Sequence, residues 1–347
     1  MEYKAVIAVD AMGGDNAPHE IVKGTVEAVN ERNDIQVCLY GDEDQVKAEL
    51  SRYTYNADQI RVVHTTEIIT PDEPPVASVR KKKDSSLVRA LNAVKSGECD
   101  AVVSGGSSGA ILVGGQVIVG KNKGVKRAPL APLIPSKKGV SLLIDCGANV
   151  DARPEHLVQF AEMGSIYMES VMGVNRPKVA IVNIGAEEEK GNALVKSTFP
   201  LLKENTKINF VGNIEARDIY NGDVDVILTE AFVGNVILKL SEGLAATLLG
   251  MVKEGMMSST RGKIGGMLVK PSLKKTLKKF DASEYGGAPL LGLKGLVVKI
   301  HGSAVAGDVR NALFQCVTFM EEDINEKIRQ NLTIPKSPQK ARQEKEA

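Results

Sequence analysis

Polar, glycine-rich loops follow the strand-like segments of this 347-residue chain. In the most informative one, residues 142–151, the apolar run Leu-Leu-Ile leads into Asp-Cys-Gly-Ala-Asn-Val-Asp. Such a run predicts a buried strand, and the residues after it predict a polar loop. Glycine lets backbone N–H groups approach a ligand closely, and a helix that begins after the loop adds partial positive charge. Loops of this kind therefore suit anions, above all phosphate.

The same construction recurs at four other places along the chain. Apolar segments at 6–9, 101–103, 179–182 and 224–228 each run into a loop with Asp, Asn, Ser or Glu. In parallel sheets covered by helices, ligands bind beyond the carboxyl ends of the strands, so we expect these loops to converge on one site. The residues predicted to bind phosphate or substrate are Asp10, Gly13, Gly14, Asp15, Ser107, Ser108, Asn149, Asn192, Glu230 and His301.

The elements that must position these loops have the pattern of an α/β protein. Strand-like and helix-like segments alternate, and most of the strands are continuous β-branched runs rather than period-two patterns. Both features are typical of parallel βαβ units. We predict one three-layer α/β/α domain over residues 1–334, with a largely parallel sheet, and a charged disordered tail over 335–347.

Residues 250–285 differ in composition from the rest of the chain. Gly and Met are abundant, and no acidic residue occurs between Glu254 and Asp281. We predict an insertion whose basic amphipathic helix contacts an anionic membrane or an acidic partner, with an ordinary dimer or core helix as an equal alternative. The predicted contact residues are Leu273, Lys274, Lys275, Leu277 and Lys278.

The composition excludes several classes of protein. Lys and Arg number 44 against 43 Asp and Glu, so we expect no nucleic-acid partner. The four cysteines lack the spacing of a disulfide framework or a metal site, which favours a reducing cytoplasm. The histidines show no metal spacing, and no Gly-x-Gly-x-x-Gly follows the first strand, so we expect neither metal nor cofactor. We predict a soluble cytoplasmic protein, and peripheral membrane contact stays open.

One alternative is a serine hydrolase. Residues 105–109 match the Gly-x-Ser-x-Gly nucleophile elbow, with Ser107 as the nucleophile and His301 as the base. Against it, so short a motif arises easily by chance in a chain with 33 glycines, and the same residues would also cradle phosphate.

The chain also resembles the PlsX family, the bacterial acyl carrier protein:phosphate acyltransferases of phospholipid synthesis. The resemblance covers the chain to about residue 330. The matching segments are Val9-Asp-Ala-Met-Gly-Gly-Asp15, Leu142-Leu-Ile-Asp-Cys-Gly-Ala-Asn-Val-Asp151, Asn183-Ile-Gly-Ala-Glu-Glu-Glu-Lys-Gly-Asn192, Gly212-Asn-Ile-Glu-Ala-Arg-Asp218, Phe232-Val-Gly-Asn235, Tyr285-Gly-Gly-Ala288 and Lys299-Ile-His-Gly302.

The resemblance implies a fold like that of isocitrate and isopropylmalate dehydrogenases, a homodimer, and transfer of a long-chain fatty acyl group from acyl carrier protein to inorganic phosphate. The acyl phosphate would pass to a membrane glycerol-phosphate acyltransferase. Lys190 and Asn235 carry over as catalytic residues, and Asp145 or Asp10 is expected to order the donors around them. Two segments depart from the family: Gly-Gly-Ser-Ser-Gly at 105–109 replaces Ala-Gly-Asn-Thr-Gly, and Thr-Glu-Ala at 229–231 replaces Thr-Asp-Gly.

We therefore predict a phosphate acyltransferase. The alternatives are a serine esterase or thioesterase that uses Ser107, and a non-catalytic module that binds acyl carrier protein or lipid.

Overall fold

The computed structural model describes residues 3–278 and 282–333, without the side chains of residues 274–278, 282 and 283. The predicted tail over 335–347 lies outside this part of the chain. The side chains of four predicted contact residues also lie outside it, namely Lys274, Lys275, Leu277 and Lys278.

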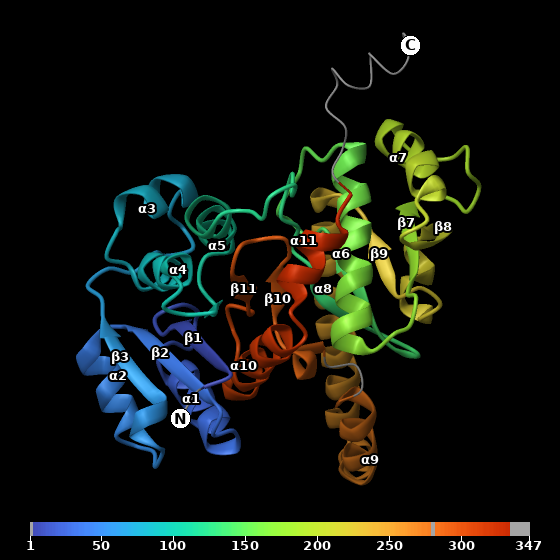
Figure 1. The fold of residues 1–347 in the computed structure, drawn as a ribbon. Coiled ribbons are helices and arrows are strands. Elements are labelled where there is room, and N and C mark those ends of the chain that lie inside the picture. The colour runs from blue at the N-terminus through green and yellow to red at the C-terminus, as the bar shows by residue number, and fades with distance from the viewer. Residues whose placement is uncertain (1–2, 279–281, 334–347) are drawn as a thin grey trace.

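The described strands form two sheets (Figure 1). The first sheet has the order β10 (Ala288–Leu290), β11 (Leu296–Lys299), β4 (Ala101–Ser104), β1 (Ala5–Asp10), β2 (Ile35–Gly41) and β3 (Ile60–His64). The second has the order β5 (Leu133–Ser136), β6 (Gly139–Ile144), β9 (Val226–Leu228), β7 (Lys178–Asn183) and β8 (Asn209–Glu215). All neighbours pair in parallel except β10 with β11 and β5 with β6.

Helices connect and cover these strands. They are α1 (His19–Glu31), α2 (Glu43–Leu50), α3 (Pro75–Lys81), α4 (Ser86–Ser96), α5 (Ser108–Gly114), α6 (Pro154–Met172), α7 (Ala193–Glu204), α8 (Ala231–Met257), α9 (Thr260–Lys278), α10 (Ala306–Glu321) and α11 (Ile324–Asn331). The predicted α/β class with largely parallel strands is confirmed. The strands are divided between two sheets because the chain leaves the first sheet after β4 and returns to it with β10 and β11.

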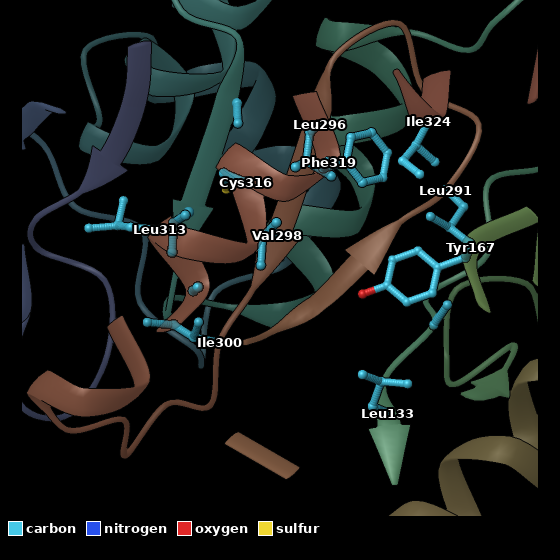
Figure 2. Packing of buried hydrophobic residues seen from close by; sticks show 14 of the residues in the cluster. Leu133, Tyr167, Leu291, Leu296, Val298, Ile300, Leu313, Cys316, Phe319 and Ile324 are labelled. Atoms are coloured by element: carbon cyan, nitrogen blue, oxygen red, sulfur yellow. The ribbon is translucent and has the colours of Figure 1, made fainter. Parts of the chain in front are cut away.

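The two sheets are joined by backbone hydrogen bonds and by a shared core. The Ala131 N–H donates to the Pro289 carbonyl at 3.0 Å, and the Leu291 N–H donates to the Pro129 carbonyl at 3.1 Å. One continuous hydrophobic cluster includes residues of β1 and β6. Figure 2 shows part of this cluster, where Tyr167 of α6 lies beside Leu291. The Tyr167 hydroxyl accepts a hydrogen bond from Gln315 Nε2 of α10 at 2.8 Å, which ties α10 to α6.

Helices α8 and α9 form a hairpin that projects from the rest of the molecule (Figure 1). The segment predicted as an insertion at 250–285 contains the end of α8, all of α9 and a short 3-10 turn at Ala282–Tyr285. By length and composition alone, α8 is also long and apolar enough to cross a membrane. In this structure most of it is exposed.

Candidate functional site

Loops after β1, β4 and β11 line a polar cavity of about 370 Å³, here called the polar cavity. These strands are neighbours in the first sheet and parallel, so their carboxyl ends meet at one edge. The structure therefore brings together several of the predicted substrate-binding residues, which are Gly14, Asp15, Ser107, Ser108 and His301.

Asp10 does not itself line this cavity, but it contacts the loops that do. Its carboxylate is buried at the end of β1 and accepts a hydrogen bond from Ser104 Oγ at 2.7 Å. Burial raises the pKa of Asp10, and the hydrogen bonds from serine hydroxyls oppose that rise. A β-carbon at Gly13 would lie 2.4 Å from Asp10 Oδ2 and 2.9 Å from the Gly106 nitrogen. Gly13 thus lets the β1 and β4 loops approach each other over the carboxylate.

A second polar group lies at the carboxyl end of β6. The buried Asp145 carboxylate accepts hydrogen bonds from the Leu130 N–H at 2.9 Å, the Ala148 N–H at 3.2 Å and Asn149 Nδ2 at 2.7 Å. Burial raises the pKa of Asp145 to about 6, against the opposing effect of these hydrogen bonds. Asp145 therefore holds the loop over 145–149 in place.

Helix α8 begins directly beside this loop. Glu230 caps it, because the carboxylate accepts hydrogen bonds from the Phe232 N–H at 2.7 Å and the Val233 N–H at 2.9 Å. Asn235 lies in the first turns of α8, with side-chain atoms 3.8–3.9 Å from the position that a β-carbon on Gly147 would occupy. The structure thus brings Asp145, Asn149 and Asn235 close together.

Lys190 and Asn192 lie at the carboxyl end of β7, in the second sheet. Lys190 Nζ forms an exposed ion pair with Glu187 at 2.8 Å, and this partner raises the pKa of Lys190. Asn192 caps α7, where its side chain accepts a hydrogen bond from the Val195 N–H at 2.9 Å. Among the described residues, Lys190 and Asn192 do not line the polar cavity.

A larger cavity of about 600 Å³, here called the apolar cavity, lies between the two sheets and α8. Its wall is mainly aliphatic, and α8 contributes one face of it. The apolar lining residues include Leu130, Pro132, Leu133, Ile134, Pro135, Leu238, Leu244, Ala245 and Leu248. From Lys239 to Leu248 the helical wall extends over about 14 Å.

Three residues line both cavities: Lys239 of α8, Lys299 at the end of β11, and His301. Sequence reasoning included His301 but missed both lysines. Lys299 could have been found, since it lies two residues before His301 at a strand end. Lys239 follows Asn235 by four residues, and residues so spaced share one face of a helix. A polar, cationic junction therefore connects the glycine-rich loops to an apolar space.

The geometry does not assemble a serine nucleophile. Ser107 Oγ accepts the Ala110 N–H at 3.5 Å as the cap of α5. The Nδ1 atom of His301 instead lies 2.7 Å from Ser303 Oγ. Burial raises the pKa of the Cys146 thiol well above its ordinary value, so that this residue is neutral. Within the described ranges, no three His, Cys, Asp or Glu side chains converge as a metal site requires. The arrangement suits the binding of an external nucleophile.

Comparison with known proteins decides the family. The sequence pattern of the fatty acid synthesis protein family matches residues 5–327. The chain belongs to this family. A phosphate acyltransferase of Clostridium acetobutylicum is 50% identical over 327 residues, which cover 94% of this chain and 98% of that protein. A putative phosphate acyltransferase of Clostridium perfringens is 49% identical, with coverage of 94% and 96%.

Solved structures confirm the fold of this family member. A phosphotransacetylase from Streptococcus pyogenes has a TM-score of 0.60 at 15% identity and covers 92% of this chain and 94% of its own. A phosphotransacetylase from Staphylococcus aureus has a TM-score of 0.56 at 17% identity, with coverage of 92% and 95%. The family and these relatives show that the chain is an acyltransferase, as predicted.

Asp145 generates a prediction about stability. The folded chain binds its proton more tightly than the unfolded chain does, because burial raises the pKa from 3.8 to about 6. Ionised Asp145 therefore makes the fold less stable as the pH rises through this range, whereas asparagine cannot ionise. The free energy of unfolding of Asp145→Asn minus that of wild type should therefore be larger by about 1–2 kcal/mol at pH 8 than at pH 5, which means that the variant gains stability relative to wild type as the pH rises. Urea denaturation at both pH values measures this difference.

Asp34→Asn is the matched control. Arg32 lowers the pKa of Asp34 to about 2, so this carboxylate is ionised in both the folded and unfolded chain between pH 5 and pH 8. The difference in the free energy of unfolding between Asp34→Asn and wild type should not change between pH 5 and pH 8. If the difference in unfolding free energy between Asp145→Asn and wild type were also independent of pH, the raised pKa of Asp145 would be contradicted.

Proposed function

We propose that the chain transfers a long-chain fatty acyl group from acyl carrier protein to inorganic phosphate, which gives an acyl phosphate. One observation carries the proposal: an apolar cavity and a glycine-rich polar cavity share a junction with two lysines, Lys239 and Lys299. An acyl chain suits the first cavity and phosphate suits the second. The names of the relatives and the resemblance to the PlsX family support the same reaction.

The reaction needs no nucleophile from the protein. A phosphate oxygen forms a bond to the thioester carbonyl carbon, and the C–S bond breaks. The electron pair leaves with sulfur, which takes up the proton that hydrogen phosphate gives up. A thiol with an ordinary pKa of roughly 8.5 is a good leaving group and needs little acid assistance. The protein must supply orientation and stabilisation of the developing oxyanion.

Asn235 and Lys190 are the catalytic residues that the resemblance implies. In our proposal Asn235 donates a hydrogen bond to the thioester oxyanion, from the helix that also carries Lys239. Asp145 and Asn149 act by holding the neighbouring loop. The exposed ion pair of Lys190 with Glu187 contributes little stability, so breaking it during the reaction costs little.

The direct test is to incubate the protein with palmitoyl acyl carrier protein and trap acyl phosphate with hydroxylamine. We expect hydroxamate only when phosphate is present. Asn235→Ala should reduce turnover roughly 100- to 1000-fold, as loss of an oxyanion donor does. Lys190→Ala should also reduce it, whereas Lys196→Ala, an exposed lysine on α7, should leave it unchanged.

Three other outcomes would contradict the proposal. Free fatty acid formed without phosphate and lost in Ser107→Ala would indicate the serine esterase. Tight binding of the acyl carrier protein with no product would indicate a non-catalytic module. Near-normal turnover of both Lys190→Ala and Asn235→Ala would overturn the assignment of these two residues.

We propose that the enzyme is cytoplasmic and contacts the membrane peripherally through the α8–α9 hairpin. At the membrane, a glycerol-phosphate acyltransferase would receive the product. Met267 and Leu268 of α9 are 75% and 76% exposed, and no acidic residue lies nearby in the sequence. Leu273, from the predicted contact set, is half-buried. Leu240 of α8, 67% exposed, suits the homodimer that the resemblance implies.

Vesicle flotation tests the membrane contact. Wild type should float with vesicles that contain phosphatidylglycerol, and Met267→Glu with Leu268→Glu should bind at least about tenfold more weakly, because two apolar side chains no longer enter the bilayer. Leu201→Glu changes an exposed leucine on α7 and should float like wild type. If the α9 double variant floated like wild type, the proposal that the hairpin contacts the membrane would be wrong.

A further inference from the structure

Lys299 occupies an unusual position for a lysine. It ends β11, a strand whose other residues are buried, and it is itself only partly exposed. Its side chain lines both the polar and the apolar cavity, as does that of Lys239 from the opposite side. Two cations therefore meet where the glycine-rich loops of the first sheet face α8.

The two lysines differ in their partners. Lys239 Nζ forms an ion pair with Glu242 at 2.6 Å. In the part of the chain that the structure describes, the hydrogen bond of Lys299 Nζ goes to the Ile300 carbonyl at 3.3 Å, and no carboxylate lies within ion-pair distance. Burial and the positive charge of Lys239 lower the pKa of Lys299, and Glu242 only partly opposes them. An anion beside Lys299 would raise its pKa and so oppose the effects of burial and of Lys239.

The other charged groups of this region have roles of their own. Asp308, which lines the apolar cavity, accepts the Val305 N–H at 2.9 Å as part of the capping box of α10. Asp15 also lines the polar cavity, and its carboxylate lies 3.5 Å from the position that a β-carbon on Gly302 would occupy. The Ser108 side chain lies at the polar cavity and adds a hydroxyl there. Three features together suit a phosphate group: the ammonium of Lys299, which has no carboxylate partner among the described residues, the hydroxyl of Ser108, and the glycine-rich loops.

We propose that Lys299 binds the inorganic phosphate that accepts the acyl group, and holds it at the mouth of the apolar cavity. The inference rests on the proposed acyl transfer to phosphate and deepens it. From this position, a phosphate oxygen faces the space in which the acyl chain lies, so the acyl phosphate forms with its charged end on Lys299. The phosphodiester of the carrier's prosthetic group has the same chemistry, and the test must separate the two.

The test compares Lys299→Met with Lys294→Met, an exposed lysine just before the start of β11. The KM for phosphate should rise roughly 10- to 100-fold in Lys299→Met, the loss expected for one charged hydrogen bond, with the KM for acyl carrier protein unchanged. Lys299→Arg should restore most of the affinity, and Lys294→Met should match wild type. A rise in the KM for the carrier alone would instead assign Lys299 to the prosthetic group and overturn the proposal.

Phosphate binding measured by calorimetry, without any acyl donor, separates this inference from the proposed function. Phosphate that binds wild type but not Lys299→Met would support the site even if no acyl phosphate forms. Equal binding to both proteins would refute it. If Lys299→Met does not fold, acetylation of the lysine amines of wild type, followed by mass spectrometry, is the alternative test. Phosphate should slow the labelling of Lys299 but not of Lys294. Equal labelling of Lys299 with and without phosphate would refute the proposal.

Discussion

The close packing of Gly234 against the end of β6 is the contact on which the site depends. A β-carbon at Gly234 would lie only 1.9 Å from the carbonyl oxygen of Asp145, so any larger residue would push α8 away from the second sheet. Because α8 is one continuous helix, this contact also fixes Asn235 beside Gly147 and places Lys239 at the junction of the two cavities. The buried hydrogen bonds of Asp145 hold the other side of the contact in place.

The junction combines two environments that suit the opposite parts of the proposed acyl phosphate. The aliphatic wall between the sheets excludes water from an acyl chain, while Lys299 and Lys239 attract an anion. A lysine with little access to solvent and no carboxylate partner among the described residues is costly to the free protein. Binding of phosphate would remove that cost, so the feature that makes the protein less stable would favour the acceptor. In this arrangement the charge of the lysines would select the anion, and the apolar area of the cavity would select the acyl group.

Much of this architecture could be predicted from the sequence, because its signals are local. Apolar runs that end in Gly and Asp or Ser mark the strand ends, and five residues so identified line the polar cavity. The division of the strands into two sheets could not be predicted, since pairing depends on contacts distant in sequence such as Ala131 with Pro289. Lys239 was missed because its spacing from Asn235 indicates only a shared helix face, whereas the cavity that this face meets is formed by segments distant in sequence.

The capping role of Glu230 shows a second limit of sequence reasoning. Glu230 stands where the family has an aspartate, and the sequence alone does not predict that the longer side chain still reaches the N–H groups of Phe232 and Val233. The location of the phosphate is the central claim, and a crystal structure of the protein with bound phosphate tests it most directly. We expect the anion within hydrogen-bond distance of Lys299 Nζ, at the polar cavity. Phosphate bound instead beside Lys190 at the end of β7, with Lys299 unoccupied, would contradict it.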